Sequence, residues 1–168
     1  VNDWFGYHMS LLHLDEAGDS LDLITETRFI KIYPTDQEIY LSSHVGATKV
    51  SYNGESIEEA NYFREGNIAH SVEGMKLSRG GGGAICGFTT GLDDYDELIF
   101  PDVYIIRFDD QLDEKWRLYY LPGRNGECFT NSIAQAENGS YYVGAQIRGE
   151  EISGFHLFKT EVDPAYVD

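Results

Sequence analysis

The sequence predicts an all-β fold made of four-stranded antiparallel units. Short runs of aromatic and β-branched residues fill much of the 168-residue chain, which has 12 Tyr and 9 Phe, and turn residues separate them. The dipeptide Asn-Gly occurs at residues 53–54, 125–126 and 138–139. Asn-Gly suits tight hairpin turns because both residues tolerate positive φ. Two strand patterns also recur along the chain in step with each other, which indicates an internal repeat.

The first recurring pattern is an apolar run followed by a basic residue, a further apolar or polar residue and an acid. It is found at residues 9–16, 103–110 and 155–161, with a weaker copy at residues 49–51. The basic positions are His13, Lys49, Arg107 and Lys159. Their average separation of about 49 residues is typical of a repeat that forms one four-stranded sheet. The shared position indicates a structural, surface-facing role for His13.

The second recurring pattern is an apolar strand with a small central residue, at residues 39–43, 84–88 and 141–145. A turn and another short apolar segment precede each copy. Each unit therefore contains strand, turn, strand, loop, strand, acidic turn and strand, as in a β-propeller blade. We expect a single repeat-built β domain with units at residues 1–28 (partial), 29–66, 67–122 and 123–168 (partial). A β-sandwich of repeated hairpins is the alternative.

These motifs resemble the propeller-type repeats of secreted and cell-surface bacterial proteins, which are common in Bacteroidetes. The residues that carry the resemblance are 83–89, 102–109 with Trp116, 138–144, 155–161, and 11–15 with Gly18. The resemblance implies a partial or small β-propeller at an extracellular or cell-surface location. It transfers architecture rather than activity, because such scaffolds host many functions.

One segment has a competing helical pattern. Ser56 and Glu59 form a potential capping box, Ile57, Ala60 and Phe63 share one helical stripe, and residue 66 is a glycine that could end a helix. The repeat instead places an outer strand in this segment. Both interpretations are open at this point.

The charge balance excludes some partners. Twelve basic residues against 29 acidic ones give a net charge of −17, which repels the phosphates of nucleic acids and anionic membranes. No apolar run is long enough for a transmembrane helix, and the N-terminus has no secretion-signal pattern. A cation, a neutral glycan or another protein is compatible with this charge, although solubility alone also explains it.

The two cysteines, Cys86 and Cys128, lie in apolar strand-like surroundings. Two cysteines do not make a disulfide scaffold, and no zinc or redox motif contains them. Buried free thiols are expected, and a single bridge is possible if their strands are neighbours.

An acidic cluster is the best candidate site for a ligand. Asp93, Asp94, Asp96, Glu97 and Asp102 provide five carboxylates within ten residues, in the segment that makes one repeat longer than the others. Calcium takes six to eight oxygen ligands from such loops and would relieve the mutual repulsion of these carboxylates. The alternative is a solvated acidic loop, because the regular spacing of a known calcium loop is missing.

No catalytic signature occurs, so we predict no catalytic residues and no required cofactor. The five histidines have no metal-binding spacing, and the glycine-rich residues 79–83 lack the Lys-Ser/Thr of a phosphate loop, which leaves a hairpin turn. Aromatic residues could stack on sugars, at positions 4, 5, 7, 95, 116, 119, 120, 141 and 142, but core packing is the usual role of strand aromatics. The sequence therefore predicts a non-catalytic scaffold or binding module for a protein or glycan partner. A glycan hydrolase or lyase on a propeller scaffold is the alternative.

Overall fold

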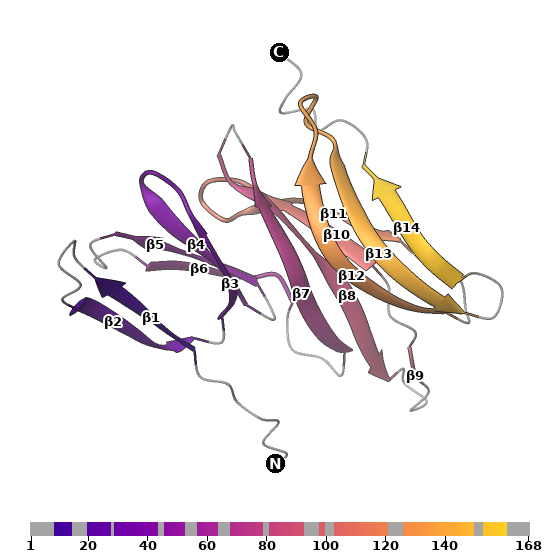
Figure 1. The fold of residues 1–168 in the computed structure, drawn as a ribbon, viewed down its shortest axis with the longest axis horizontal. Coiled ribbons are helices and arrows are strands. Elements are labelled where there is room, and N and C mark those ends of the chain that lie inside the picture. The colour runs from indigo at the N-terminus through magenta and orange to yellow at the C-terminus, as the bar shows by residue number, and fades with distance from the viewer. Residues whose placement is uncertain are drawn as a thin grey trace.

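The computed structural model describes residues 9–14, 20–27, 29–43, 46–52, 57–63, 68–78, 81–92, 98–99, 103–120, 126–149 and 153–160. Every element in these residues is a β-strand, which confirms the predicted all-β class. The strands form four sheets that fan out across the molecule without closing into a ring (Figure 1).

The sheets follow one another along the chain, and we name them A to D. Sheet A contains β1 (Met9–Leu14) and β2 (Ser20–Thr27). Sheet B contains β3 (Phe29–Pro34), β4 (Glu38–Ser43), β5 (Gly46–Ser51) and β6 (Ile57–Asn61). Sheet C contains β7 (Ile68–Leu77), β8 (Gly83–Leu92), β9 (Leu98–Ile99), β10 (Val103–Phe108) and β11 (Glu114–Tyr120). Sheet D contains β12 (Gly126–Gln135), β13 (Tyr141–Gly149) and β14 (Ser153–Lys159).

All strand pairs are antiparallel, and the strands of each sheet fall within one of the four expected units. In sheet C, β8 pairs directly with β10, and the short β9 is an excursion that pairs only with the end of β8. The repeat is also visible in the backbone. The register shifts between His13 and Leu14 in β1, and it shifts between Arg107 and Phe108 in β10, at the same step of the repeated pattern.

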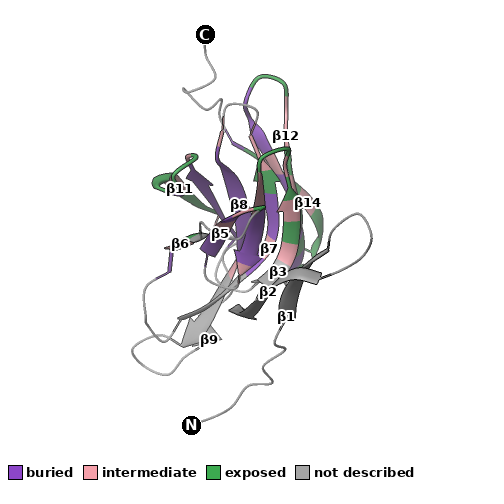
Figure 2. Cartoon of the chain, turned by 90° about the vertical axis from the view of Figure 1, so that its left-hand side faces the viewer, coloured by how far each residue is buried: buried purple, intermediate pink, exposed green. Residues whose placement is uncertain are grey.

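Sheet C is the middle layer, and its central strands are buried on both faces. Every residue of β10 is buried, and Figure 2 shows the purple of the inner strands against the greener outer strands β11 and β14. Tyr104 and Ile106 pack against sheet B, whereas Val103 and Ile105 pack against sheet D. Full burial of such a side chain contributes roughly 1.5–3 kcal/mol, so this strand anchors both interfaces.

Neighbouring sheets come closest at their first strands, because β7 contacts both β3 and β12. Small residues allow this approach: Gly74 has Cys86 Sγ and Ile133 beside it, and a Cβ added at Gly74 would lie 3.1 Å from that sulfur. Farther out, the large rings of Trp116 and Tyr120 fill the space between sheets C and D. The gap between sheets therefore widens from the first strand to the last.

The first strand of sheet C carries a β-bulge between Val72 and Gly74. A bulge leaves backbone groups without ladder partners. Strand β3 supplies partners for them: the Tyr33 hydroxyl accepts a hydrogen bond from the Met75 N–H at 3.0 Å, and Lys31 Nζ donates to the Glu73 carbonyl. Sheets B and C are thus joined by polar bonds as well as by apolar packing.

Three hairpins share one type of turn, in which the fourth residue has positive φ. In each turn the N–H of the first residue donates to the carbonyl of the fifth: Ser78 to Gly82, Asp109 to Asp113 and Ala136 to Ser140. Their fourth residues are Gly81 (φ 96°), Leu112 (φ 64°) and Gly139 (φ 84°). The Asn138-Gly139 hairpin is therefore confirmed, with the positive φ at the glycine. Residues 53–54 and Asn125 lie outside the described residues.

The helical interpretation of the segment after Ser56 is wrong, because residues 57–61 form β6. Pairing with β5 decides the conformation. Lys49 lies opposite Glu58 in the ladder, and its Nζ is 2.8 Å from Glu58 Oε2. Strand pairing and this cross-strand ion pair outweigh the local helical pattern.

Candidate functional site

The described residues form a pocket of about 560 Å³ that opens between sheets B and C at their outer strands. Sheet B contributes the end of β6, and sheet C contributes the β10–β11 turn and the start of β11. The lining residues are Ala60, Asn61, Tyr62, Leu112, Asp113, Glu114 and Arg117. Most of these side chains are polar, so the pocket suits a polar ligand.

Arg117 is the centre of the pocket's polar network. Its Nε and Nη2 donate to the two carboxylate oxygens of Glu114 at 3.1 and 2.5 Å, and Nη1 donates to the Tyr119 hydroxyl at 3.1 Å. Nη2 also donates to the Tyr62 carbonyl at 2.7 Å, and the guanidinium lies 5.0 Å from the centroid of the Phe63 ring. The hydrogen bond to Glu114 raises the Arg117 pKa, so this pair is a fixed, mutually neutralised unit.

Tyr62 forms the floor of the pocket but is unsuited to proton transfer. Its side chain is buried, and its hydroxyl donates to the Leu112 carbonyl at 3.0 Å. Burial raises the Tyr62 pKa well above its ordinary value, and the negative charge of Glu114 raises it further. The phenol therefore stays protonated at any physiological pH, and its role is to hold the turn against β6.

Leu112 shapes the rim of the pocket through its backbone. Its φ of 64° is uncommon for a residue with a side chain, and glycine occupies the same position in the two matching turns. The Leu112 side chain packs in the core between sheets B and C, where it is only 3% exposed. The turn thereby fixes Asp113 and Glu114 at the pocket mouth.

The exposed ring of Tyr119 stands next to this network. Tyr119 is 46% exposed on the edge strand β11, and the hydrogen bond from Arg117 fixes its hydroxyl. Three other aromatic candidates pack between sheets C and D: Trp116 meets Tyr141, and Tyr120 meets Phe158. The core-packing interpretation is right for these residues but not for Tyr119 or for the half-buried Tyr142, whose ring centroid lies 5.7 Å from Lys159 Nζ. Residues 4, 5, 7 and 95 lie outside the described residues.

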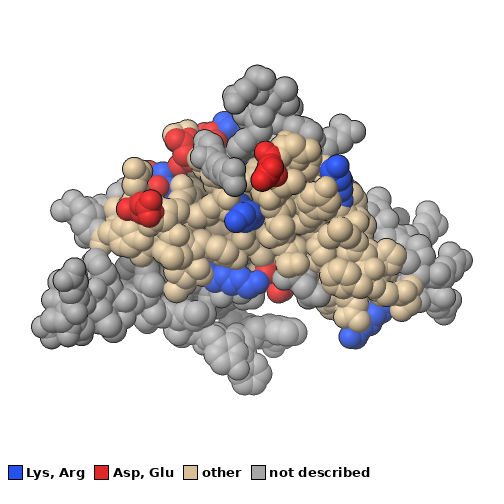
Figure 3. Space-filling view, turned by 45° about the horizontal axis from the view of Figure 1, so that its top comes forward, with Lys and Arg blue, Asp and Glu red and all other residues tan. Residues whose placement is uncertain are grey.

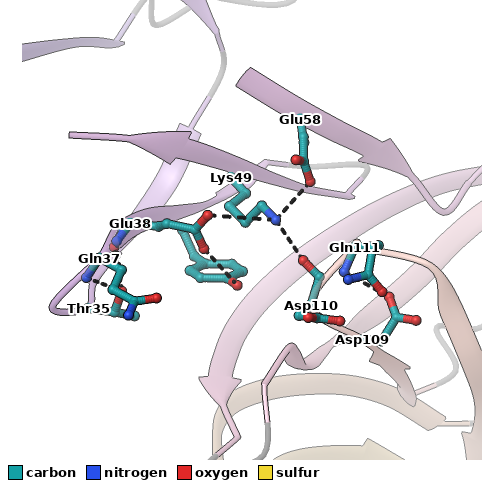
Figure 4. A network of polar contacts seen from close by, with 9 residues as sticks. Thr35, Gln37, Glu38, Lys49, Glu58, Asp109, Asp110 and Gln111 are labelled. Atoms are coloured by element: carbon teal, nitrogen blue, oxygen red, sulfur yellow. Dashed lines mark hydrogen bonds and ion pairs between the residues drawn. The ribbon is translucent and has the colours of Figure 1, made fainter. Parts of the chain in front are cut away.

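A second polar cluster is centred on Lys49 (Figure 4). Lys49 Nζ donates to the Asp110 carbonyl at 2.7 Å and lies 2.8 Å from Glu58 Oε2 and 3.8 Å from Glu38 Oε1. Burial alone would lower the Lys49 pKa, but the hydrogen bond to Glu58 and the charge of Glu38 raise it overall. This lysine links sheet B to the β10–β11 turn of sheet C, which is a structural role.

Arg107, at the equivalent repeat position, also has a structural role, but it is buried rather than surface-facing. It is 5% exposed, and its Nη1 and Nη2 donate to the carbonyls of Gly83 and Gly81 at 3.1 Å each. The guanidinium thus binds the carbonyls that lead into β8, and the basic residue at this repeat position is buried in sheet C. The side chain of His13 lies outside the described residues.

The predicted acidic cluster lies outside the described residues. Asp93, Asp94, Asp96 and Glu97 belong to the connection between β8 and β9, and Asp102 directly precedes β10. Calcium at this loop therefore stays a prediction. Among the side chains that the structure describes, no group of three or more His, Cys, Asp and Glu residues could hold a metal ion.

Cys86 is a free thiol buried between sheets C and D. Burial raises its pKa to about 12, so the thiol stays protonated and unreactive. The backbone of Cys128 pairs with Ile147 in sheet D, and its side chain lies outside the described residues. Cys86 matches the buried-thiol interpretation.

Comparison with known proteins leaves the family open: no protein-family model matches the chain, and no curated protein matches its sequence. Within the described part of the chain, no helix is long and apolar enough to cross a membrane.

The sequence did not point to the pocket between β6 and β11. Glu114 and Arg117 are three residues apart on a strand, a spacing that usually puts side chains on opposite faces. The register shift between Arg107 and Phe108 in the neighbouring strand accompanies their convergence. A basic residue beside Trp116 in an otherwise acidic protein was the one available signal.

Proposed function

We propose that this protein is a non-catalytic binding module, built on a propeller-like scaffold, that binds a neutral glycan at the pocket between sheets B and C. The observation that carries the proposal is an exposed aromatic ring, Tyr119, beside a polar pocket in which Arg117 neutralises Glu114. Sugar rings stack on such aromatic faces, and planar polar groups such as those of Asn61, Asp113 and Glu114 match pairs of hydroxyls.

The chemistry of the described residues supports binding rather than catalysis. Arg117 neutralises Glu114, and the Tyr62 phenol is held protonated by burial. A general acid or base needs a pKa close to the working pH, and the shifted groups of this pocket have pKa values moved away from neutrality. The proposed secreted or cell-surface location rests on the repeat resemblance.

The proposal is tested by titrating the protein with a panel of neutral polysaccharides in a calorimeter. We expect saturable binding that Tyr119→Ala weakens at least tenfold. Leu118→Ala is the matched control, since Leu118 is the neighbouring residue on β11, is 41% exposed and points to the opposite face.

Three results would contradict the proposal. The first is the absence of binding to every neutral glycan, which would end the proposal for this ligand class. The second is an equal loss of binding in the Leu118 variant, which would place the ligand elsewhere. The third is the release of reducing ends or unsaturated sugars by the wild-type protein, which would establish the catalytic alternative.

A further inference from the structure

Sheet D ends one strand earlier than sheets B and C. In sheet B the third strand, β5, pairs with a fourth strand, β6, and in sheet C the equivalent strand β10 pairs with β11. The third strand of sheet D is β14, and no strand among the described residues pairs with its outer edge (Figure 1). The N–H and C=O groups along such an edge are able to pair with an added strand.

β14 has few of the features that protect a sheet edge against pairing. Protected edge strands commonly carry charged side chains, proline or a bulge. The edge strand β6 contains two glutamates, and β11 contains three charged residues. β14 has no Asp, Glu, Arg or Lys before Lys159 at its end, and its register with β13 is unbroken. Phe155 and Leu157 are 69% and 65% exposed on it, so an apolar edge is open to a further strand.

The side of β11 that faces sheet D indicates where this further strand would lie. Trp116 and Tyr120 pack between sheets C and D, and the Tyr120 hydroxyl donates to the Lys159 carbonyl of β14 at 3.2 Å. Leu118 points to the same side, because side chains alternate along a strand. Its ladder partner Ile105 is fully buried, whereas Leu118 is 41% exposed. The apolar side of sheet C thus extends beyond the part that sheet D covers.

The start of β14 leaves room for a large side chain of an added strand. Gly154 lies opposite Ile147, whose side chain packs between sheets C and D. A Cβ added at Gly154 would have no atom within 4 Å. A large ring on a neighbouring strand is a common cover for a glycine in a sheet. An aromatic residue of the added strand would therefore fit opposite Gly154.

The charge of sheet D favours an acidic partner. The chain as a whole has a net charge of −17. The described side chains of β12, β13 and β14 nevertheless include Arg148 and Lys159 and no carboxylate. Figure 3 shows the described acidic side chains toward the left and centre, whereas the right-hand side, where sheet D lies in Figure 1, shows tan and blue. An acidic residue of an added strand would lie beside a cation if it were placed opposite Lys159.

We propose that the edge of β14 binds an extended peptide of a partner protein as the fourth strand of sheet D. Main-chain hydrogen bonds hold such a peptide, and its alternate side chains give the specificity. The peptide is antiparallel to β14, like every other strand pair of this fold, and begins with an acidic residue opposite Lys159. Its residues opposite Phe158, His156 and Gly154 face sheet C and are apolar, and the last of them is aromatic.

A synthetic peptide tests this proposal on the whole chain. The probe is Glu-Val-Thr-Val-Thr-Trp-Thr with blocked ends, whose glutamate is designed to lie opposite Lys159 and whose tryptophan is designed to lie opposite Gly154. We expect saturable binding, and we expect the peptide to slow hydrogen exchange at the amides of β14 but not at those of β6. The matched control is the same sequence with every backbone nitrogen methylated, which cannot pair with a strand and should not bind.

Three protein variants locate the bound peptide. Leu118→Asp places a charge on the side of β11 that the peptide covers, so binding should weaken about tenfold. Ile32→Asp is the matched control, because Ile32 is 46% exposed on β3 in sheet B, and it should bind the probe like the wild type. Lys159→Glu should weaken binding about threefold, as expected for an exposed ion pair, and a probe that begins with lysine should recover this loss. Circular dichroism verifies that each variant is folded.

Several results would overturn the proposal. They are the absence of saturable binding, equal binding of the methylated peptide, an unchanged affinity in Leu118→Asp, and slowed exchange on a strand other than β14. A lysine probe that does not recover the affinity of Lys159→Glu would contradict the antiparallel placement. If every amide of β14 already exchanged slowly in the free protein, the edge would be filled by another part of the chain or by a second copy, and the proposal would be wrong.

Discussion

Arg117 Nη2, on the last strand of sheet C, donates a 2.7 Å hydrogen bond to the carbonyl of Tyr62, which directly follows the last strand of sheet B. The same guanidinium is engaged by both oxygens of Glu114. The gap between sheets B and C is wide at their outer strands, β6 and β11. A single side chain, Arg117, connects the two sheets there. Stability and the shape of the pocket should both depend on it.

Replacing Arg117 by lysine should lower the free energy of unfolding by about 2 kcal/mol. A lysine keeps the charge but cannot form the paired bonds to Glu114 and the bond to Tyr62 together, and hydrogen bonds to charged groups contribute roughly 1.5–3 kcal/mol. Urea denaturation measures the change. Lys115→Ala is the control, because its ion pair with Asp109 is exposed and its loss should shift the midpoint much less. Equal midpoints for the wild type and Arg117→Lys would show that the network does not join the sheets.

At position 112, the glycine variant should be more stable than the alanine variant, which is the reverse of the usual order. Both Leu112→Gly and Leu112→Ala lose the buried side chain, but only glycine relieves the strain of positive φ, which costs about 1–2 kcal/mol. We expect Leu112→Gly to be more stable than Leu112→Ala by about 1 kcal/mol in urea denaturation. Leu41, fully buried in β4, is the control, and there the alanine variant should be the more stable one. If the alanine variant were the more stable one at both positions, there would be no strain at Leu112.

Two buried threonines should respond in opposite ways to replacement by valine. Thr130 Oγ1 is buried and has no hydrogen-bond partner among the described residues, so Thr130→Val should raise the free energy of unfolding by about 1 kcal/mol. Thr160 Oγ1 accepts a bond from the Tyr141 N–H at 2.8 Å, so Thr160→Val should lower it by about 1–2 kcal/mol. Thermal denaturation of both variants measures the two changes. A lower melting temperature for Thr130→Val would show that the Thr130 hydroxyl does have a partner.

Asp109 should make stability depend on pH in the acidic range. Burial raises the Asp109 pKa, but the hydrogen bond from Lys115 and the N–H groups of Asp113 and Gln111 together outweigh it and lower the pKa below 3.8 overall. A lowered folded-state pKa means that the stabilisation is present above the unfolded-state pKa and is lost as pH falls through the folded-state pKa. The urea midpoints of wild type and Asp109→Asn should therefore differ at neutral pH and converge below pH 3.8. A difference that stays constant with pH would assign the effect to packing.

Calcium should stabilise the protein if the connection between β8 and β10 binds it. The expected result is a higher melting temperature in millimolar calcium than in chelator, with the difference removed by Asp94→Asn/Asp96→Asn. A binding cation stabilises the folded state by mass action, and the effect increases with its concentration. Equal melting temperatures would identify the five carboxylates as a solvated acidic surface.

The sequence was sufficient to predict the all-β class. The repeated pattern also places His13 and Arg107 at the same shift of the backbone register. Alternating apolar residues and a well-placed Asn138-Gly139 turn carry enough local information for this. The local pattern failed at residues 57–61, where pairing with β5 overrode a helical stripe. Such an override is invisible in a single segment because the deciding partner, Lys49, lies on another strand.

The pocket could not be predicted in the same way. Its residues come from two sheets, and they meet through the packing of sheet B on sheet C rather than through any spacing in the sequence. Leu112 is a further example, since a leucine carries no sequence signal for positive φ, and only its equivalence to Gly81 and Gly139 in the folded turns reveals it.

The direct pairing of β8 with β10 has a practical consequence for protein engineering. Because Phe88 already lies opposite Val103 in the ladder, the chain between Leu92 and Val103 can be exchanged without breaking the pairing of β8 with β10. Lengthening a surface connection costs only about 0.6 kcal/mol per doubling of its length. Foreign peptides grafted between residues 92 and 103 should therefore be displayed at one end of sheet C, while its two-faced core keeps its packing.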